Sequence, residues 1–431
     1  MSSPFPPPDP DSQRGYLKLR NEIMAGGADD VAGDEPAGGR RAAIGLGAIA
    51  LLLVALAWWS LWAFVFVVLL IGCIFLHEVG HFVTARWTGM KATQFFLFMG
   101  PKLWSFRRGE TEYGVRAYPI GAYVRIIGMN NLDEVDPADE PRAYRNQTYP
   151  RRMLVICAGS MMHILIAVAL MFGVYATKGA LGPTGEVVIS TVVAGGPADN
   201  AGIRPDDIVV SIDGQTVSSA DEFVAVIRSH EPTDIIPIVV ERDGQEVAVT
   251  VGLGSNTNPG EFFGSAFLGV SSADVQDWVG MPVGEAAVRS ITDLGTQAWQ
   301  SVSGVAKVLN PVNIWQHVSG QNTDPTSQPT TVVGVSRFSD LVGSETGLGG
   351  ILLMLAGVNV FVGLFNLFPM LPFDGGHAAI ATYERLRTRK GRPAYHADVS
   401  KMIPVAMTMM ALLAFVLLAS LYLDIVRPLG G

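Results

Sequence analysis

Long apolar runs alternate with polar segments along this chain. Four regions are apolar over about 20 residues or more, the length that an α-helix needs to cross a bilayer: 42–88, 153–176, 348–370 and 402–427. We expect the third of these helices to extend over 348–377. Because the segments between the runs have the mixed composition of soluble protein, the pattern predicts a polytopic α-helical membrane protein with globular insertions.

The first apolar region is too long for one crossing of a hydrocarbon core of about 30 Å. Three tryptophans lie in its middle: Trp58, Trp59 and Trp62. Since tryptophan favours the headgroup level of a bilayer, we expect one span over 42–58, a tight outer turn near Trp59 and Ser60, and a second span over 61–88. A single long, tilted helix that emerges from the outer face is the alternative.

Composition and charge narrow the class of protein further. With 49% apolar and 16% charged residues among 431, the chain is too hydrophobic for an ordinary soluble protein. Lys and Arg gather in 89–152 and 385–401 and are sparse in 177–347. Because loops rich in these residues stay in the cytoplasm, we expect 89–152 and 385–401 on the cytoplasmic side. We expect 177–347 on the other side of the membrane. Residues 1–40, rich in Pro, Gly and Asp, predict a disordered cytoplasmic tail.

The motif "HEVGH" lies in the second half of the first apolar region. Ionisable residues at bilayer depth are costly unless they are paired or bind a ligand. On a helix, His77 and His81 lie one turn apart on one face, where both imidazoles can bind one Zn²⁺. Glu78 then lies beside the metal as the general base that activates water. The alternative is a chance match, in which carbonyl groups satisfy both histidines.

A catalytic zinc site needs a third protein ligand. The stretch "GLFNLFPMLPFDGGHA" offers Asp374, which follows Pro369 and Pro372. Prolines interrupt a helix, and irregular backbone at membrane depth is tolerated where it lines a cavity or is covered by protein. We therefore expect Asp374 as the third ligand and His377 as its rival. A helix N-cap just outside the membrane is the alternative role for Asp374.

The two motifs together resemble the signatures of the site-2 protease family of intramembrane zinc metalloproteases. "HEVGH" and "NLFPMLPFDGGH" lie in separate spans, and the likeness covers nearly all of 61–427. The arrangement is similar to the bacterial branch of that family, the regulator of sigma-E protease. The resemblance implies that His77, His81 and Asp374 bind zinc and that Glu78 is the general base.

The same resemblance assigns Asn366 to substrate binding, where it would hold the substrate backbone near the metal. Two positions depart from the family pattern. Phe373 replaces a common leucine, which exchanges one apolar side chain for another. His163 stands where many members have asparagine; we expect it to have a structural role, such as a hydrogen bond between helices, with a place beside the site as the alternative.

Residues 92–128 alternate apolar and polar positions between glycines and prolines, which predicts short β-hairpins. Similar proteins carry a cytoplasmic β-loop here that dips back toward the membrane. An exposed strand edge can pair with an extended segment. That property matters because a transmembrane helix hides its carbonyls in hydrogen bonds and must unwind before it is cut. A plain cytoplasmic hairpin is the alternative.

The polar segment after the second apolar region resembles a PDZ domain over 183–254, carried by "AGGPADNAGIRPDDIVVSIDG". The pattern predicts a short helix at Pro197–Ala201, a helix over 220–229 and a hairpin with Asp243-Gly244 at its tip. Outside the cytoplasm, such a domain binds a chain end as an added strand or acts as a size filter. Residues 283–309 have the spacing of an amphipathic helix on the outer membrane face, or of a packing helix.

These observations predict a zinc-dependent intramembrane endopeptidase in the cell membrane, with its site toward the cytoplasmic side. We expect single-span transmembrane proteins as substrates, cut after a first extracytoplasmic cleavage, and no nucleic acid as partner. The resemblance adds anti-sigma factors as a substrate class. The alternatives are a membrane-anchored PDZ scaffold and a membrane protease that trims lipidated C-termini.

Overall fold

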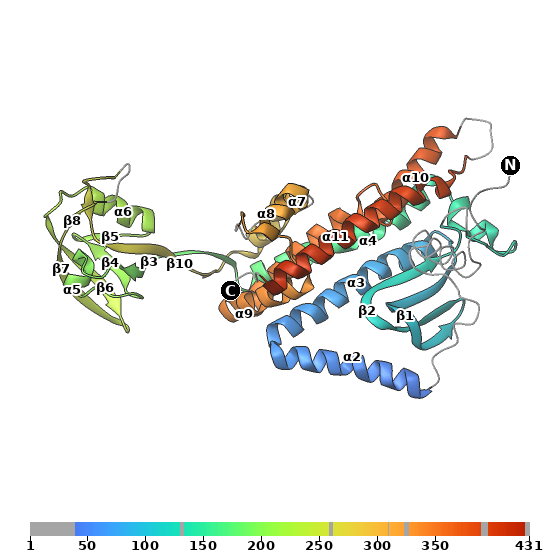
Figure 1. Ribbon diagram of the computed structural model, residues 1–431, viewed down its shortest axis with the longest axis horizontal. Coiled ribbons are helices and arrows are strands. Elements are labelled where there is room, and N and C mark those ends of the chain that lie inside the picture. Colours follow the sequence, from blue (N-terminus) through green and yellow to red (C-terminus); the bar gives the residue numbers. More distant parts are fainter. Residues whose placement is uncertain are drawn as a thin grey trace. The chain divides into compact units, whose positions relative to one another are not determined.

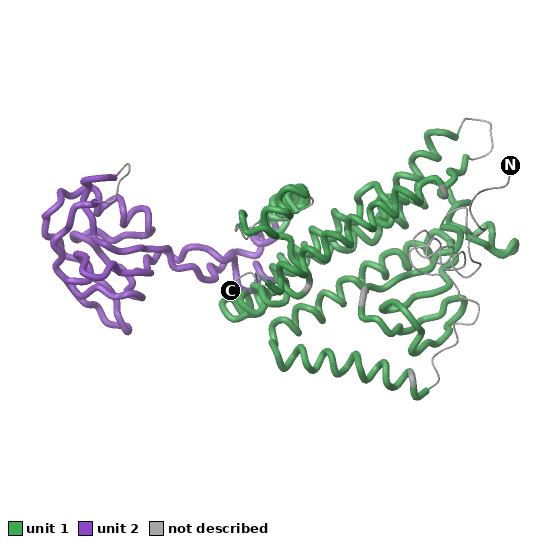
Figure 2. The backbone as a smooth tube through the Cα atoms, viewed as in Figure 1, with its two compact units in different colours: residues 1–173, 288–431 green, residues 174–287 purple. Residues whose placement is uncertain are grey.

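The computed structural model describes residues 39–129, 133–257, 262–308, 310–322, 327–388 and 395–426. The chain divides into two compact units, of which unit 1 comprises residues 1–173 and 288–431 and unit 2 comprises 174–287 (Figure 2). Nearly all of the expected tail over 1–40 lies outside the described residues. Its last two residues, Gly39 and Arg40, belong to the first helix rather than to a tail.

Five helices among the described residues are long and apolar enough to cross a membrane. They are α2 (Gly39–Trp59), α3 (Leu61–Trp87), α4 (Tyr149–Thr177), α9 (Val332–Asn366) and α11 (Ile403–Val426), shown in Figure 1. Large apolar side chains such as Leu51, Leu165 and Leu418 are exposed on them. These side chains would be unfavourable in water. Within a helix the backbone N–H and C=O groups bond to each other, which is what a lipid environment requires.

Helices α3 and α9 form the core of unit 1. Phe66 and Cys73 of α3 are buried against Ile351 and Leu355 of α9. Helix α4 joins them, because Gly363 of α9 approaches it so closely that a Cβ would lie 3.2 Å from the α4 backbone. Small residues allow membrane helices this close approach. Gly80 of α3 approaches the Ala158 backbone of α4 in the same way, so α4 packs against both α3 and α9.

The first apolar region is divided into α2 and α3 at Ser60. The Ser60 hydroxyl accepts a hydrogen bond from the Ala63 N–H at 3.0 Å, which caps the start of α3. The same hydroxyl donates to Asp340 Oδ1 of α9 at 2.5 Å. The structure therefore has the two helices and the turn that the tryptophans predict, and it does not have the single long helix.

The segment expected over 348–377 forms two helices, and the break between them lies at the two prolines, as these residues predict. Helix α9 begins earlier than expected, is kinked at Gly347, where φ is 65°, and ends at Asn366. After a non-helical segment, α10 (Asp374–Arg387) begins as a separate helix. The two prolines of the motif lie in that segment and cannot donate the backbone hydrogen bonds of a continuing helix, which is why α9 stops.

The other expected spans differ from the structure by a few residues. Helix α4 extends the expected 153–176 span at both ends, since Pro150 is tolerated in the first turn of a helix. Helix α11 begins at Ile403 and is described as far as Val426, so residue 427 of the expected span lies outside the described residues.

A small sheet follows α3 in the chain. Its strands are β1 (Ala92–Arg108) and β2 (Thr111–Ile126). Both bend back on themselves near positions with positive φ, Phe98 in β1 and Gly121 in β2. Residues 94–97 therefore pair with two segments, 122–125 on one side and 112–115 on the other. Within the described chain, 122–125 pair with no further strand and form an edge of this sheet.

Unit 2 is built on an antiparallel sheet with the strand order β10-β3-β4-β6-β7, and β5 pairs with β4. The strands are β3 (Ala180–Val192), β4 (Ile208–Ile212), β5 (Gln215–Thr216), β6 (Ile235–Arg242), β7 (Gln245–Gly252) and β10 (Val270–Val279), with β8 (Gly254–Ser255) and β9 (Ala266–Phe267) as a short separate pair. Two helices, α5 (Pro197–Ala201) and α6 (Ala220–Arg228), complete the unit. Val187, Phe223 and Ile238 belong to its buried core.

The helices and the hairpin expected in this inserted domain are present, but its boundary is wider. Asp243 and Gly244 at the hairpin tip both have positive φ, as a tight two-residue turn requires. The sheet is not complete within 183–254, because β10 pairs with β3 and supplies its edge. A strand that joins from beyond a long connection leaves no local signal in the sequence, so the pattern places the end too early.

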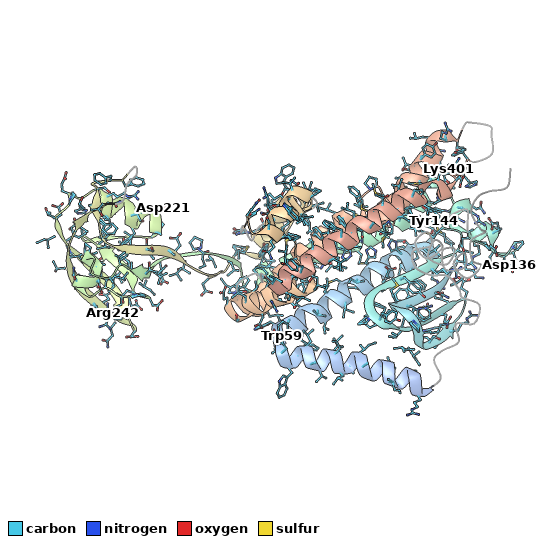
Figure 3. All side chains as sticks on the ribbon, viewed as in Figure 1. Trp59, Asp136, Tyr144, Asp221, Arg242 and Lys401 are labelled. Carbon is cyan, nitrogen blue, oxygen red and sulfur yellow. The ribbon has the colours of Figure 1, made fainter. Side chains whose placement is uncertain are left out.

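A buried ion pair stabilises the sheet of unit 2. Asp207, which is 1% exposed, accepts hydrogen bonds from Arg242 Nε at 2.7 Å and from Nη2 at 2.6 Å; Arg242 is labelled in Figure 3. The Arg204 N–H donates to the same carboxylate at 2.8 Å. Burial alone would raise the pKa of Asp207, but these donors outweigh it and hold the pKa of the carboxyl below its ordinary value.

The remaining elements among the described residues are shorter helices and one amphipathic helix. They are η1 (Glu140–Arg142), η2 (Tyr144–Asn146), α7 (Val283–Val308), α8 (Pro311–Ser319) and η4 (Val399–Met402). Helix α7 covers the range expected over 283–309, except that Leu309 lies outside the described residues. Helix α8 is an additional element that the sequence pattern does not predict.

Candidate metal centre

Two imidazoles of α3 lie next to each other on one face of the helix. His77 and His81 are four residues apart, so both side chains project to the same side. His81 Nδ1 lies 2.8 Å from the carbonyl oxygen of Val155 in α4. Because a carbonyl only accepts hydrogen bonds, this nitrogen carries the proton and the lone pair of the ring is at Nε2. That Nε2 atom lies 3.1 Å from His77 Nε2.

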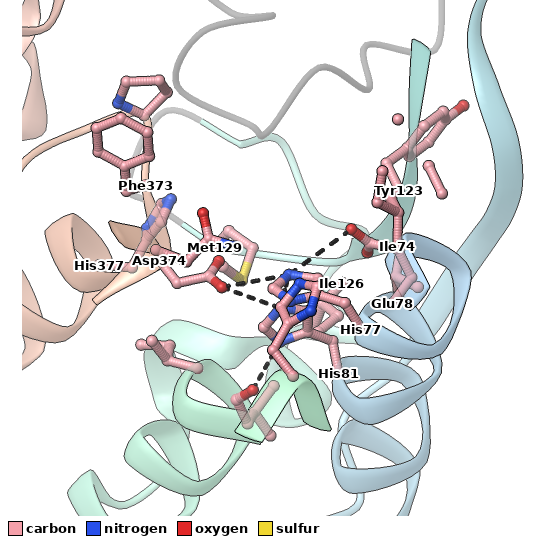
Figure 4. Close-up of a pocket in the computed structure, with 18 of the residues that line it drawn as sticks. Ile74, His77, Glu78, His81, Tyr123, Ile126, Met129, Phe373, Asp374 and His377 are labelled. Atoms are coloured by element: carbon pink, nitrogen blue, oxygen red, sulfur yellow. Dashed lines mark hydrogen bonds and ion pairs between the residues drawn. The ribbon is translucent and has the colours of Figure 1, made fainter. Parts of the chain in front are cut away.

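The carboxylate of Asp374 reaches the same point from the start of α10. Gly375 and Gly376 follow it and pack against the backbone of 367–371, where any Cβ would clash with main-chain atoms. This close packing requires glycine and holds the first turn of α10 in place. Asp374 Oδ2 lies 3.2 Å from His81 Nε2 and 3.5 Å from His77 Nε2 (Figure 4).

The three facing atoms have the spacing of zinc ligands. Ligands bound to zinc at roughly 2.0–2.1 Å in a tetrahedron lie about 3.3–3.4 Å from one another, and the three distances here are 3.1, 3.2 and 3.5 Å. Asp374 Oδ2 is buried and receives no hydrogen bond from the residues that the structure describes. A bound cation would satisfy this oxygen and the imidazole lone pairs, so the donor set fits zinc.

The described part of the chain contains one group of three or more His, Cys, Asp or Glu residues that could hold a metal ion. Its members are His77, His81 and Asp374. His377, the rival third ligand, lies nearly one turn further along α10 and lines the same cavity without belonging to that group. In Figure 4 its ring lies beside the carboxylate of Asp374. The structure thus brings Asp374, and not His377, to the two imidazoles.

A cavity of about 280 Å³ opens beside the three residues. Glu78 lines it from α3, half-buried, with its carboxylate 4.0 Å from His77 Nε2. Asn366, the last residue of α9, lines it as well. Another wall is the edge segment of β2, including Tyr123 and Val124. The structure therefore gathers every residue that the sequence assigns to the site around one cavity.

Gly159 of α4 faces the imidazole pair, and sequence reasoning does not single it out. A Cβ built on this residue would lie 2.7 Å from His77 Nε2. Any side chain larger than hydrogen would therefore occupy the space in front of the imidazoles. The signal that could have identified it is the run "AGS" in the middle of an apolar helix, which is typical of close contact between membrane helices.

His163, one turn beyond Gly159 on α4, is 2% exposed and lines the cavity. Its Nδ1 lies 2.7 Å from Asn359 Oδ1 of α9. Since Asn359 Nδ2 donates to the Leu355 carbonyl at 2.8 Å, the amide oxygen is the acceptor and His163 Nδ1 is the donor. The expected hydrogen bond between helices is confirmed. The His163 ring also lies 4.9 Å from the His77 ring, so this residue contacts the site as well.

Known proteins match most of this chain. Zinc metalloprotease Rip1 of Mycobacterium tuberculosis (strain ATCC 35801 / TMC 107 / Erdman) is 32% identical over 394 residues, which cover 82% of this chain and 94% of that protein. Zinc metalloprotease Rip1 of Mycolicibacterium smegmatis is 31% identical over 395 residues, 82% of this chain and 95% of that protein. Among solved structures, the PDZ domain of an SdrC-like protein from Listeria monocytogenes is 21% identical, covers 20% of this chain and 85% of its own, and has a TM-score of 0.18.

A family match extends over nearly the whole membrane part. Residues 65–411 match the family described as Peptidase family M50. This range contains both "HEVGH" and "NLFPMLPFDGGH", the motifs whose residues meet at the cavity. Together with the 32% identity to a relative over most of its length, the match shows that the chain is a metalloprotease and belongs to peptidase family M50, the site-2 protease family that its two motifs predict.

Proposed function

We propose that this protein is a zinc-dependent endopeptidase that cuts transmembrane proteins inside the membrane. The observation that carries the proposal is the convergence of His77, His81 and Asp374, with facing atoms 3.1–3.5 Å apart, among apolar helices. Hydrolysis at this depth requires water within the protein, and the cavity of about 280 Å³ beside the three residues offers space for it. Membership of peptidase family M50 supports the same activity.

His77 Nε2, His81 Nε2 and Asp374 Oδ2 are the atoms that would hold zinc. Three protein ligands leave one position of a tetrahedral site open, which is the pattern of catalytic rather than structural zinc sites. When bound, zinc supplies Lewis acidity, which polarises a peptide carbonyl and makes water more acidic. The Val155 carbonyl fixes the His81 ring in the orientation that presents Nε2 to the site.

Glu78 is the residue that we assign to proton transfer. Its carboxylate lines the cavity next to the proposed ligands but does not belong to their group. From this position it accepts a proton from the attacking water and later returns a proton to the nitrogen of the leaving amine. A glutamine at this position would keep the size of the side chain and remove the proton acceptor.

The substrate backbone, in this proposal, pairs with the edge of β2. One edge of 122–125 is hydrogen-bonded to 94–97, and the other edge pairs with no further strand in the described chain. Residues 122–124 line the cavity. A transmembrane helix that unwinds loses its i to i−4 hydrogen bonds, and a strand edge offers replacements. Asn366, which lines the same cavity at the end of α9, has an amide that can bind one further backbone group.

We further infer that the substrates are single-span proteins that another protease has first shortened outside the cell. The cavity is lined by β2, which lies within the Lys- and Arg-rich segment 89–152, and such segments favour the cytoplasm. Cleavage there releases a cytoplasmic fragment, and the family resemblance implies anti-sigma factors as one substrate class. Unit 2 then lies outside, where it binds or filters the shortened outer end.

The decisive experiment compares purified wild-type protein with Glu78→Gln. Cleavage of a model single-span substrate and the zinc content of each protein are measured together. We expect zinc in both and cleavage by the wild type alone, because the exchange removes the proton acceptor and keeps the three ligands. Asp374→Ala serves as the second variant, with loss of both zinc and cleavage expected.

Other outcomes point to other functions. Cleavage by Glu78→Gln at the wild-type rate would remove Glu78 from the mechanism. A scaffold would bind its partner equally well with either residue and cut nothing under any condition. A protease specific for lipidated C-termini would cut only substrates that carry the lipid, so a matched pair of substrates with and without it separates the two peptidase activities.

A further inference from the structure

A buried ion pair connects α10 with α4, away from the metal centre. Glu384 lies on α10, the helix that begins with Asp374. Its Oε2 accepts a hydrogen bond from Arg152 Nη1 of α4 at 2.7 Å, and its Oε1 accepts one from the Ala397 N–H at 2.7 Å. Only 8% of Arg152 and 6% of Glu384 are exposed. Breaking one partner of such a pair leaves an uncompensated buried charge.

Neighbouring groups strengthen this connection. The guanidinium carbon of Arg152 lies 4.7 Å from the centre of the Tyr144 ring. Burial raises the pKa of Tyr144 to about 12, so its phenol is neutral and Glu384 is the anion that pairs with Arg152. A second contact joins the same helices, since the Tyr149 hydroxyl lies 3.2 Å from Thr382 Oγ1. The start of α4 is therefore bonded to α10 at two points.

The face of α4 that bonds to α10 also bonds to the histidines. Arg152, Val155 and Gly159 have the spacing i, i+3 and i+7, so they lie along one face of the helix. The Val155 carbonyl lies 2.8 Å from His81 Nδ1, and Gly159 faces the imidazoles. One face of α4 thus contacts both the helix that carries the histidines and the helix that carries the carboxylate.

The first turn of α10 is held only by backbone packing, because Gly375 and Gly376 contact the main chain of 367–371 and have no side chains. How the rest of the helix is rotated and shifted along its axis depends on the side chains that follow them. The first apolar contacts of α10 are those of Ala378, which packs against a cluster that includes Val155 of α4, and of Ile380, which joins a cluster with Leu371. A shift of α10 along or around its axis would move the Asp374 carboxylate directly, while leaving the histidines of α3 where they are.

We propose that the Arg152–Glu384 pair positions Asp374 for metal binding by fixing α10 against the face of α4 that also orients His81. The inference rests on the proposed zinc ligands. Neither Arg152 nor Glu384 belongs to the ligand group, so both are positioning residues. Outer residues that orient ligands typically change metal affinity by roughly 10- to 100-fold.

The test is a cycle of zinc affinities, measured on the full chain in detergent by competition with a chromophoric chelator. The four proteins are the wild type, Glu384→Gln, Asp374→Ala and the double variant. We expect Glu384→Gln to weaken zinc binding by roughly 10-fold or more in the wild-type background. In the Asp374→Ala background we expect no further loss, because the carboxylate through which Glu384 acts is already absent.

Two results would overturn the inference. One is wild-type affinity in Glu384→Gln. The other is an equal fold-loss in both backgrounds, which would mean that the exchange loosens the whole fold and with it His77 and His81. If Asp374→Ala binds zinc as tightly as the wild type, the proposed ligand set itself is wrong, so the two failures are distinguishable.

A matched control comes from unit 2, where Asp207 forms a comparable buried pair with Arg242. Asp207→Asn removes the charge from that pair and should leave zinc affinity unchanged. Arg152→Lys keeps the positive charge and loses part of the hydrogen-bond geometry, so we expect an affinity between those of wild type and Glu384→Gln. The same cycle with Arg152→Lys replaces the first if Glu384→Gln does not yield folded protein.

Discussion

The space in front of the two imidazoles depends on a residue that binds nothing. A Cβ on Gly159 would lie 2.4 Å from His81 Nε2 and 2.7 Å from His77 Nε2, so Gly159→Ala must displace α4 or the imidazole rings. We expect this variant to lose most of its bound zinc and roughly 100-fold of its cleavage rate, as a displacement of about 1 Å at a reacting centre can cause. Zinc content and substrate cleavage, measured on the same preparation, check both effects.

The matched control is Gly173→Ala in the same helix. A Cβ on Gly173 meets no atom within 4 Å, and alanine in a helix interior is favoured over glycine by about 1 kcal/mol. This variant should therefore keep its zinc and its activity. Full zinc content and activity in Gly159→Ala as well would show that the space at this position does not limit the site.

Asp207 makes the stability of unit 2 depend on pH. Donors from Arg242 hold the pKa of Asp207 below its ordinary value against the effect of burial. An unfolded aspartate titrates near about pH 3.9, so this carboxylate contributes its full stabilisation above that pH and loses it as the pH falls through the lower, folded pKa. We expect Asp207→Asn to lower the stability of unit 2 at pH 7 by about 1.5–3 kcal/mol and to remove this part of its acid sensitivity.

Hydrogen exchange of the β4 and β6 amides in the full chain, corrected for the intrinsic pH dependence of exchange, measures this stability. The wild type should lose protection below about pH 4, and Asp207→Asn should show a smaller additional loss over the same range. An identical acid response in both proteins would mean that Asp207 is not the group that titrates.

Local spacing made some site residues predictable and left others hidden. His77, Glu78 and His81 could be found because their spacing alone places them together on a helix. Asp374 could be suggested because prolines mark a break at membrane depth. The close approach of Gly159 could not, since it depends on how α3 and α4 pack, and a glycine in a membrane helix has several possible reasons.

Among the elements, α7 has an unusual distribution of side chains. Val288, Ile291, Trp299 and Val302 are each more than half exposed, and at 100° per residue they fall on one face of the helix. On the opposite face, Gln297 Nε2 donates to Met171 Sδ of α4 at 3.5 Å. The helix thus turns its apolar face outward, and lipid is the solvent that favours this orientation.

Spin labels on α7 test whether that face contacts lipid. We expect a nitroxide at Ile291 to be accessible to dissolved oxygen and protected from a water-soluble nickel reagent in a reconstituted bilayer, because oxygen concentrates in lipid. A label at Arg289, which is turned away from the apolar face, should show the reverse preference. Equal accessibility of both labels to the nickel reagent would favour a helix in water, the simple packing role.

Elements were predictable where one stretch of sequence determines them. The apolar lengths indicated the spans, and Asp243-Gly244 indicated a hairpin. The division of 348–377 into α9 and α10 was visible in the prolines but not in the hydrophobicity. The double pairing of 94–97 in the small sheet could not be predicted, because which strands pair depends on contacts that the alternation of side chains does not encode.

At the scale of the whole molecule, the order of the helices that could span a membrane predicts on which side each loop of the chain lies. We expect one crossing by α4 between the β1–β2 region and unit 2, and a return of the chain by α9 after unit 2. The excess of Lys and Arg in 89–152 predicts that the β1–β2 region lies in the cytoplasm. Sequence alone could predict this order and the meeting of Asp374 with His77 and His81, whereas the close approach of Gly159 of α4 to the imidazoles required the structure.

Chemical labelling tests the orientation, and with it the direction in which a cleavage product leaves. Asp136 and Asp221 are exposed residues on either side of α4 in the chain (Figure 3). With a membrane-impermeant maleimide on intact cells, we expect Asp221→Cys to react at once and Asp136→Cys to react only after permeabilisation. The parent chain is the control, because Cys73 and Cys157 lie within helices that we expect to span the membrane and should remain unlabelled.

The possible deviations have different meanings. Labelling of both introduced cysteines from the same side would contradict a crossing by α4. Exchanged labelling would place the β2 wall of the cavity toward the outside, and a fragment cut there could not be a cytoplasmic one. Only the expected pattern, Asp221→Cys outside and Asp136→Cys inside, allows the cavity around His77, His81 and Asp374 to release its product into the cytoplasm while unit 2 meets the other end of the substrate.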